Sequence, residues 1–160
     1  MTDYEKLTLI LQGVVAVTAF VTLAFLYKQV RVMVDQIIAT QEASRAQSAL
    51  ALVDFLQSVE VREARQCVRS DLSQKHHSLW TEEERRFASV VCANYDVAAS
   101  LLRAKLAPVD LIVINWGPSI AHCHQVLSPY MSELRSKPGG NPGYWSNFDW
   151  LHSQVASGKP

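Results

Sequence analysis

The stretch Leu7–Tyr27, LTLILQGVVAVTAFVTLAFLY, contains no charged residue. As a helix it would be roughly 30 Å long, about the thickness of the hydrocarbon core of a bilayer. Charged residues flank both ends, and Tyr4 and Tyr27 lie where aromatic side chains commonly meet the membrane interface. The stretch therefore predicts a single transmembrane helix, and the lipid bilayer is the first expected partner of the chain.

Two other interpretations of this stretch fit the sequence less well. A signal peptide has a basic amino-terminal region and a shorter apolar segment, whereas residues 1–6 read MTDYEK and carry two acids and one base. A buried helix this apolar needs a larger surrounding domain than 160 residues supply. Within the stretch, Gln12, Gly13 and Ala16 are candidates for contact with another membrane helix, because polar and small residues favour such packing.

The charges beside the span indicate its orientation. Lys6 precedes it, and Lys28 and Arg31 follow it, a small excess of positive charge that favours a cytoplasmic carboxyl-terminal domain. The cysteines agree with a reducing compartment, because they are odd in number and widely spaced. They are Cys67, Cys92 and Cys123.

The distribution of glycine and proline predicts an all-α fold. Residues 14–107 contain neither, whereas all six prolines and five of the six glycines lie from Pro108 onward. Such a long stretch without turn residues favours helices, and no convincing strand alternation is present. We expect a transmembrane anchor over residues 1–28, a helical stalk over 29–48 and a small helical bundle over 49–160.

The stalk carries an apolar stripe. Val30, Val34 and Ile37 recur at helical spacing, and they are candidates for contact with a partner. The stripe ends in the polar segment 40–48, so a long parallel coiled coil is not supported. A membrane protein partner or a homo-oligomer is therefore the expected assembly.

Several signals mark the helices of the bundle. Thr81 and Glu84 predict a capping box at the start of a helix. Trp116-Gly117-Pro118-Ser119 predicts a break, with Ser119 capping the following helix and Trp116 either filling the corner or lining a pocket. The spacing of Trp145, Phe148 and Leu151 predicts a last core helix, with an exposed docking patch as the alternative.

Charge excludes some partners. The chain has 15 basic and 15 acidic residues, which gives no electrostatic reason to expect nucleic acid binding. The charged helix near residues 60–69 contains Arg62, Glu63, Arg65 and Arg69. We interpret these four side chains as a solvated face with ordinary surface pairing.

The sequence offers no catalytic or metal site. His122-Cys123-His124 lacks the three- or four-residue spacing of helical metal ligands, and the neighbouring Cys123 and His124 are poorly placed to act as nucleophile and base. No phosphate-binding glycine motif is present. We expect no enzyme activity and no cofactor; a membrane-bound hydrolase would need Cys123 to converge with His76 or His77 and an acid.

Several of these segments together resemble a known family. They include residues 60–65, Trp80-Thr81 with three glutamates, Val91 to Asp96, and Trp116-Gly-Pro-Ser-Ile followed by Cys123-His124. This pattern resembles a family of bacterial membrane-anchored proteins classed as a domain of unknown function. The resemblance implies a bacterial origin and a helical domain tethered to the inner membrane, and it supplies no catalytic residue.

Two functions follow as expectations. The first is a membrane-tethered, non-enzymatic accessory or assembly subunit that docks on a larger membrane complex or on itself. The alternative is a membrane-anchored small-molecule or metal-binding sensor with a pocket near Trp116 and His124. The candidate pocket or interaction residues are Tyr95, Asp96, Trp116, Pro118, Cys123 and His124.

Overall fold

The computed structural model describes residues 3–158, apart from the side chains of residues 5–7, 9 and 10. Lys6, used above for orientation, lies outside the described side chains. The described residues form helices and connecting turns with no strand, which confirms the all-α prediction. The elements are α1 (Asp3–Gln57), α2 (Val59–Ser70), the short 3-10 helices η1 (Leu72–Gln74) and η2 (His77–Leu79), α3 (Glu82–Arg103), α4 (Val109–Ser136) and α5 (Ser146–Ala156).

The chain divides into two compact units, Met1–Ser44 and Arg45–Pro160. In the first unit, α1 is a single exposed helix in which the hydroxyls of Thr18 and Thr22 donate to the carbonyls of Val14 and Thr18, both at 2.8 Å. By length and composition, Leu11–Gln57 contains a stretch able to cross a membrane, and none of that stretch is buried. A signal sequence or a core helix can meet the same length and composition criteria.

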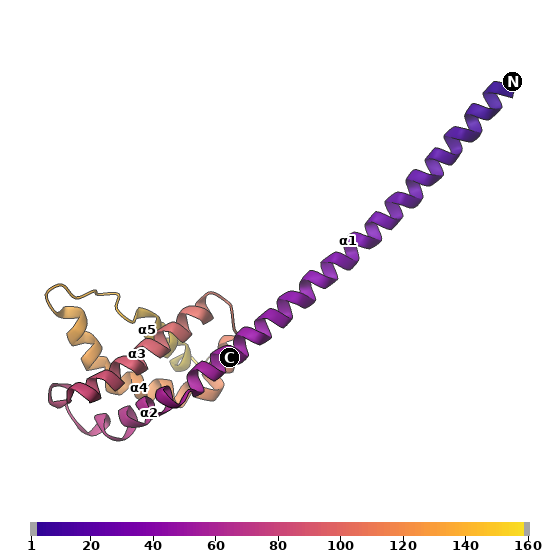
Figure 1. Cartoon of the computed structure of the whole chain (residues 1–160). Helices are drawn as coiled ribbons and strands as arrows, with labels where there is room; N and C mark the ends of the chain where they lie inside the picture. Colours follow the sequence, from indigo (N-terminus) through magenta and orange to yellow (C-terminus); the bar gives the residue numbers. More distant parts are fainter. Residues whose placement is uncertain (1–2, 159–160) are drawn as a thin grey trace. The chain divides into compact units, whose positions relative to one another are not determined.

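The second unit is a helical bundle (Figure 1). α2 packs on α3 and α4, and α5 packs on the same two helices. The aromatic segment closes this core as predicted, because Trp145, Phe148 and Leu151 are buried. Phe148 stacks on Tyr95 of α3 with ring centroids 5.1 Å apart. Trp145 has a φ of 57°, an uncommon conformation for a bulky residue, and its buried side chain holds it there.

Local signals set where α3 begins. The Thr81 hydroxyl accepts from the Glu84 amide at 3.2 Å, and the Glu84 carboxylate accepts from the Thr81 amide at 2.8 Å. This reciprocal pair confirms the predicted capping box. The Glu84 carboxylate also pairs with Lys75 at 2.6 Å, so it connects the segment before the helix to its first turn.

The predicted break at Trp116-Gly117-Pro118-Ser119 is wrong, because α4 runs through it without interruption. Proline inside a helix removes one hydrogen bond and crowds the preceding turn. Pro118 and Pro129 are eleven positions apart, so they share one face of α4, and both are exposed. The carbonyls they leave unpaired belong to Ile114 and Gln125, which are also exposed, so water can hydrate them.

Gly117 makes the passage through Pro118 easier. A residue before proline is disfavoured in the helical region because its Cβ clashes with the proline ring, and glycine has no Cβ. Gly117 is buried, and a Cβ built there would lie 3.5 Å from Val155 of α5. This distance is an ordinary van der Waals contact, so the packing of α5 against α4 does not itself require glycine.

Replacing Pro118 with alanine should stabilise the fold. The new amide can donate to the Ile114 carbonyl, and alanine is the better helix former, so we expect a gain of about 1–2 kcal/mol in the free energy of unfolding. The measurement is the thermal unfolding midpoint of the detergent-solubilised chain, followed by circular dichroism. Pro138→Ala, in the loop after α4, is the control and should give no gain; an unchanged midpoint for Pro118→Ala would contradict the prediction.

Candidate functional site

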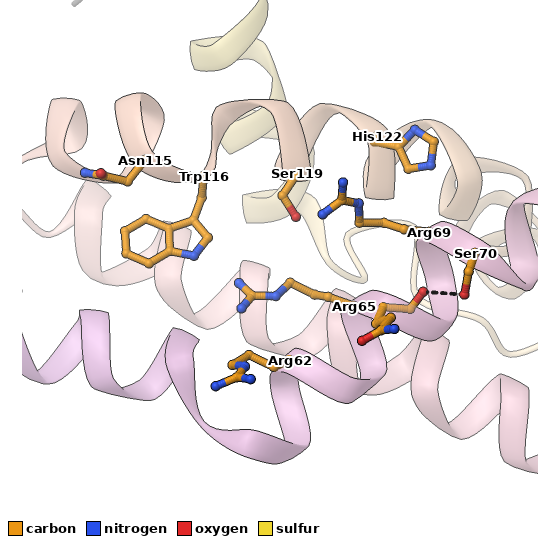
Figure 2. Close-up of a pocket in the computed structure, with 9 residues that line it drawn as sticks. Arg62, Arg65, Arg69, Ser70, Asn115, Trp116, Ser119 and His122 are labelled. Carbon is orange, nitrogen blue, oxygen red and sulfur yellow. Dashed lines mark hydrogen bonds between the residues drawn. The ribbon is translucent and has the colours of Figure 1, made fainter.

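A pocket of about 650 Å³ lies between α2 and α4 in the bundle (Figure 2). We call it the arginine pocket. Its lining contains three arginines, an aromatic ring and small polar groups, and no acidic side chain. The lining residues are Arg62, Arg65, Gln66, Arg69, Ser70, Asn115, Trp116, Ser119 and His122.

The three arginines come from one face of α2. Arg62, Arg65 and Arg69 are spaced i, i+3 and i+7, which places them on one side of a helix. The adjoining face buries Val61, Ala64 and Val68 in the bundle core, and this burial fixes the rotation of α2. The hydrophobic face of α2 therefore dictates that its arginine face lines the pocket.

Arg65 is the central group of the pocket. Only 8 % of its surface is exposed, and its Nη2 donates to the Leu56 carbonyl at 2.7 Å. That carbonyl lies in the last turn of α1, where helix carbonyls lack partners and the dipole is negative, so the contact offsets part of the buried charge. Nη1 of Arg65 is also buried and has no hydrogen-bond acceptor. An unsatisfied buried donor costs about 1–3 kcal/mol, and more for a charged group.

Nothing in the described part of the chain neutralises these charges by direct pairing. The ion pairs among residues 3–158 involve Lys75, His77, His124, Arg135 and Lys137 as cations, and the three pocket arginines are in none of them. The arginines are also each other's helical neighbours, an arrangement that destabilises an isolated helix. The pocket is therefore a concentrated and uncompensated positive site.

The α4 side of the pocket is neutral and mostly hydrogen-bonded. Ser119 shares a 3.0 Å hydrogen bond with the Tyr95 hydroxyl of α3. Asn115 donates from Nδ2 to the Leu111 carbonyl at 2.7 Å, which leaves its Oδ1 as a free acceptor. Trp116 is 8 % exposed, and His122 is exposed at the far end of the pocket. This wall offers one aromatic surface, one acceptor and one imidazole.

The structure brings only one of the predicted pocket residues, Trp116, into the lining. Pro118 is exposed on α4 and does not line the pocket. Tyr95 lies behind the lining and reaches it through Ser119. Burial raises the pKa of the Tyr95 hydroxyl, and its bond to Ser119 and the charge of Arg65 oppose that shift. Tyr95 therefore remains a neutral phenol that supports the wall.

Asp96 has a role in folding instead. Its Oδ1 accepts from the backbone amides of Asn147 and Phe148, at 2.9 and 3.2 Å, and its Oδ2 accepts from the Asn147 side chain at 3.2 Å. These amides belong to the first turn of α5, where helix amides lack internal partners. A carboxylate at this end is also favoured by the helix dipole, so Asp96 fastens α5 to α3.

The cysteines are placed as core residues. Cys92 and Cys123 are fully buried, and Cys67 is partly buried; all three are free thiols. Burial raises the pKa of Cys123 to about 11 and that of Cys92 well above its usual range, so both stay protonated at neutral pH. Within the described residues, no group of three His, Cys, Asp or Glu side chains can hold a metal ion.

His124 does not reach the pocket near Trp116, which corrects the expected pairing of these two residues. They are eight positions apart on α4, a rotation of roughly 80°, so their side chains face different neighbours. His124 Nε2 lies 2.8 Å from Asp149 of α5, and Arg135 pairs with the same carboxylate at 2.7 Å. The His124 ring also stacks on His152, with centroids 4.0 Å apart and planes inclined by 3°.

This stacked pair predicts a pH-dependent stability. Burial and the adjacent His124 lower the pKa of His152, and the charge of Asp149 opposes the shift. The unfolded chain then takes up a proton at His152 at a higher pH than the folded protein does, so stability falls as the pH drops below about 6.5. Thermal unfolding between pH 7.5 and about 5 should record this loss, and His152→Gln should reduce it. His122→Gln, at an exposed site, is the control, and an equal pH response in wild type and His152→Gln would contradict the prediction.

The predicted contact residues of the first unit are available on the helix surface. Gln12, Gly13 and Ala16 are exposed in α1, and no atom lies within 4 Å of a Cβ built on Gly13. Val30, Val34 and Ile37 are 58 %, 48 % and 58 % exposed. The described structure gives neither set an intramolecular role.

The pocket arginines are the site residues that the sequence interpretation missed. Arg65 was expected on a solvated face with surface pairing, but it is buried and has no acidic partner. A signal was present in the sequence. At three and four positions from Arg62, Arg65 and Arg69 there is no acidic residue, whereas Glu60 and Glu63 lie elsewhere on the helix. Arginines that have no acidic residue three or four positions away on their own helix indicate an acceptor outside that helix.

The fold and the pocket define an all-α domain with an arginine-lined cavity, preceded by a long apolar helix. The family model described as "Domain of unknown function (DUF4760)" matches residues 9–155, and the chain belongs to this family. The match confirms the resemblance to a family classed as a domain of unknown function. No curated protein and no solved structure matches the chain.

Proposed function

We propose that this protein is a membrane-tethered, non-enzymatic domain that binds a small anionic ligand in the arginine pocket. The single observation that carries the proposal is the lining itself, in which three arginines of α2 meet without an acidic side chain and one of them, Arg65, is almost fully buried. An anionic ligand in the pocket would supply the negative charge that the lining lacks. It would also relieve the repulsion between Arg65 and its neighbours Arg62 and Arg69.

The size and chemistry of the pocket support a small ligand. Its volume of about 650 Å³ lies within the usual range for small-molecule sites, roughly 300–1,000 Å³. Guanidinium groups bind carboxylate and phosphate oxygens in a two-pronged geometry, and charge-assisted bonds of this kind are about twice as strong as neutral ones. The protonated Cys123 and the absence of an acid from the lining favour binding over catalysis.

We further propose that α1 crosses the bacterial inner membrane once and leaves the bundle in the cytoplasm. Its apolar stretch is long enough, and the Thr18 and Thr22 hydroxyls are satisfied within the helix, as hydrocarbon surroundings require. Lys28 and Arg31 follow the span, which favours a cytoplasmic carboxyl-terminal side. The three free thiols suit a reducing compartment.

The test is anion-induced stabilisation of the detergent-solubilised chain. Phosphate, pyrophosphate, sulfate and citrate are titrated while the thermal unfolding midpoint is measured. A ligand at about 100 times its dissociation constant should stabilise the fold by about 2.7 kcal/mol. At least one of these anions should raise the wild-type midpoint in a saturable manner.

Arg65→Met is the decisive variant. It removes a buried charge that has no carboxylate partner and keeps an apolar side chain of similar length, but it also removes the bond to the Leu56 carbonyl, so the free energy of unfolding of the ligand-free fold should change by no more than about 1–3 kcal/mol. The anion-dependent rise in the midpoint should disappear. Arg86→Gln, an exposed arginine of α3 outside the pocket, is the matched control and should respond like wild type. Equal responses in Arg65→Met and wild type would refute the proposed site.

A second candidate function rests on a different observation, the apolar stripe of Val30, Val34 and Ile37, whose side chains are about half exposed. Exposed apolar side chains at helical spacing suit docking against another helix. Under this proposal the protein is an accessory or assembly subunit. A photo-crosslinking residue at Val34 should capture a membrane protein partner or a second copy in native membranes, whereas the same residue at the exposed Ala39, on the opposite side of α1, should not. Equal or absent capture at both positions would count against docking through this stripe.

A further inference from the structure

The arginine pocket has two chemically different ends. Asn115 and Trp116 lie at one end of the α4 wall, and His122 lies at the other, as Figure 2 shows. Trp116 and His122 are six positions apart on the helix, which corresponds to roughly 9 Å along the axis. Arg69 and Ser70 of α2 lie at the His122 end (Figure 2). The ligand that fits such a lining is elongated, with different chemistry at its two ends.

The α2 wall of the pocket, along which the three arginines lie, favours phosphate (Figure 2). All three cationic side chains are arginines, whose planar forks match the oxygens of phosphate. Arg65 lines the pocket as an almost fully buried side chain, whereas Arg62 and Arg69 are exposed. Three guanidinium groups without a carboxylate suit a group that carries more than one negative charge, such as a phosphate monoester or a diphosphate.

The aromatic end favours a planar ring. The Trp116 indole lines the cavity, although the protein covers most of its surface. Indole rings stack on nucleobases of any sequence because every base has a π-face. Beside it, Asn115 has committed Nδ2 to the Leu111 carbonyl, so its Oδ1 is the free acceptor at this end. An exocyclic amine on a base supplies the matching donor.

We propose that the ligand of the arginine pocket is a nucleotide, a nucleoside mono- or diphosphate. Its base lies against Trp116, its exocyclic amine donates to Asn115, and its phosphates accept from Arg62, Arg65 and Arg69. This inference rests on the proposed anion-binding function and names the ligand class of that site. The binding is non-covalent and requires no further reactant.

The test compares whole nucleotides with their parts on the full chain in detergent. Isothermal titration calorimetry is performed with AMP, ADP, GMP and GDP, and with adenosine, ribose 5-phosphate, pyrophosphate and inositol trisphosphate. At least one nucleotide should bind tenfold or more tightly than pyrophosphate and ribose 5-phosphate, a difference of about 1.4 kcal/mol. Adenosine alone should bind more weakly than AMP.

Two tryptophan variants assign the base contact. Trp116→Leu keeps an apolar side chain, although a smaller one, and removes the ring, so nucleotide affinity should fall at least tenfold while pyrophosphate affinity stays within threefold of wild type. Trp116→Phe should recover part of the loss, because it restores a flat ring. Trp150→Leu is the control, since Trp150 lies on α5 outside the pocket. Circular dichroism of each variant verifies that the bundle is folded.

The outcomes separate this inference from the proposed function. If pyrophosphate binds as tightly as every nucleotide, and Trp116→Leu leaves both unchanged, the pocket binds anions without recognising a base. If inositol trisphosphate binds more tightly than the nucleotides, the pocket is a lipid-headgroup site. Both results overturn the nucleotide proposal and leave anion binding in place. If no anion binds to the wild-type chain, the anion-binding function itself is refuted.

Discussion

The hydrogen bond between the Arg65 guanidinium and the Leu56 carbonyl is the constraint that organises the bundle around its pocket. A buried guanidinium needs acceptors, and α1 supplies one where its last turn leaves a carbonyl without an internal partner. The bond connects the end of α1 to the middle of α2, across the turn at Ser58. The bond also holds Arg65 in the lining between α2 and α4. In this position its guanidinium group contributes positive charge to the cavity.

Overall composition conceals this charge. Equal numbers of acidic and basic residues make the chain neutral, yet one face of α2 has three arginines and no acid. Acidic side chains are used elsewhere. Asp96 holds the first turn of α5, Asp149 binds His124 and Arg135, and Glu84 completes the cap of α3. No acidic side chain lines the pocket, so a chain that is neutral overall has a positive pocket.

Much of the fold could be predicted from local sequence, because local physics decides it. The capping box at Thr81, the aromatic spacing of Trp145 and Phe148, and the glycine-free stretch before Pro108 each specify structure within a few residues. The prediction of a helix break at Pro118 was wrong because the effect of a proline inside a helix depends on the surroundings of the whole helix face. With Gly117 before it and exposed carbonyls around it, the helix can continue.

The pocket was harder to predict for the same kind of reason. Whether Arg65 is solvated depends on which helix covers α2, and sequence periodicity does not reveal the covering helix. Trp116 could be assigned to a possible pocket because an aromatic residue beside glycine and proline is unusual. His124 was assigned wrongly to that pocket because eight residues along a helix bring a side chain back only approximately to the same face. Tertiary packing, rather than local preference, decides both cases.

Apart from the bond between Arg65 and the Leu56 carbonyl, the arginine face adds nothing to the core packing of α2. Val61, Ala64 and Val68 already bury the inner side of α2, and a buried charge without a carboxylate partner weakens a fold more than an apolar side chain of similar volume does. Like charges at helical spacing add to that cost. Arg65 also lies close enough to influence Tyr95, whose hydroxyl is held by Ser119 of the opposite wall. The side chains that lower the stability of the ligand-free fold are thus the ones whose charge a bound anion would neutralise. Such an arrangement is expected where a protein gives up stability for function.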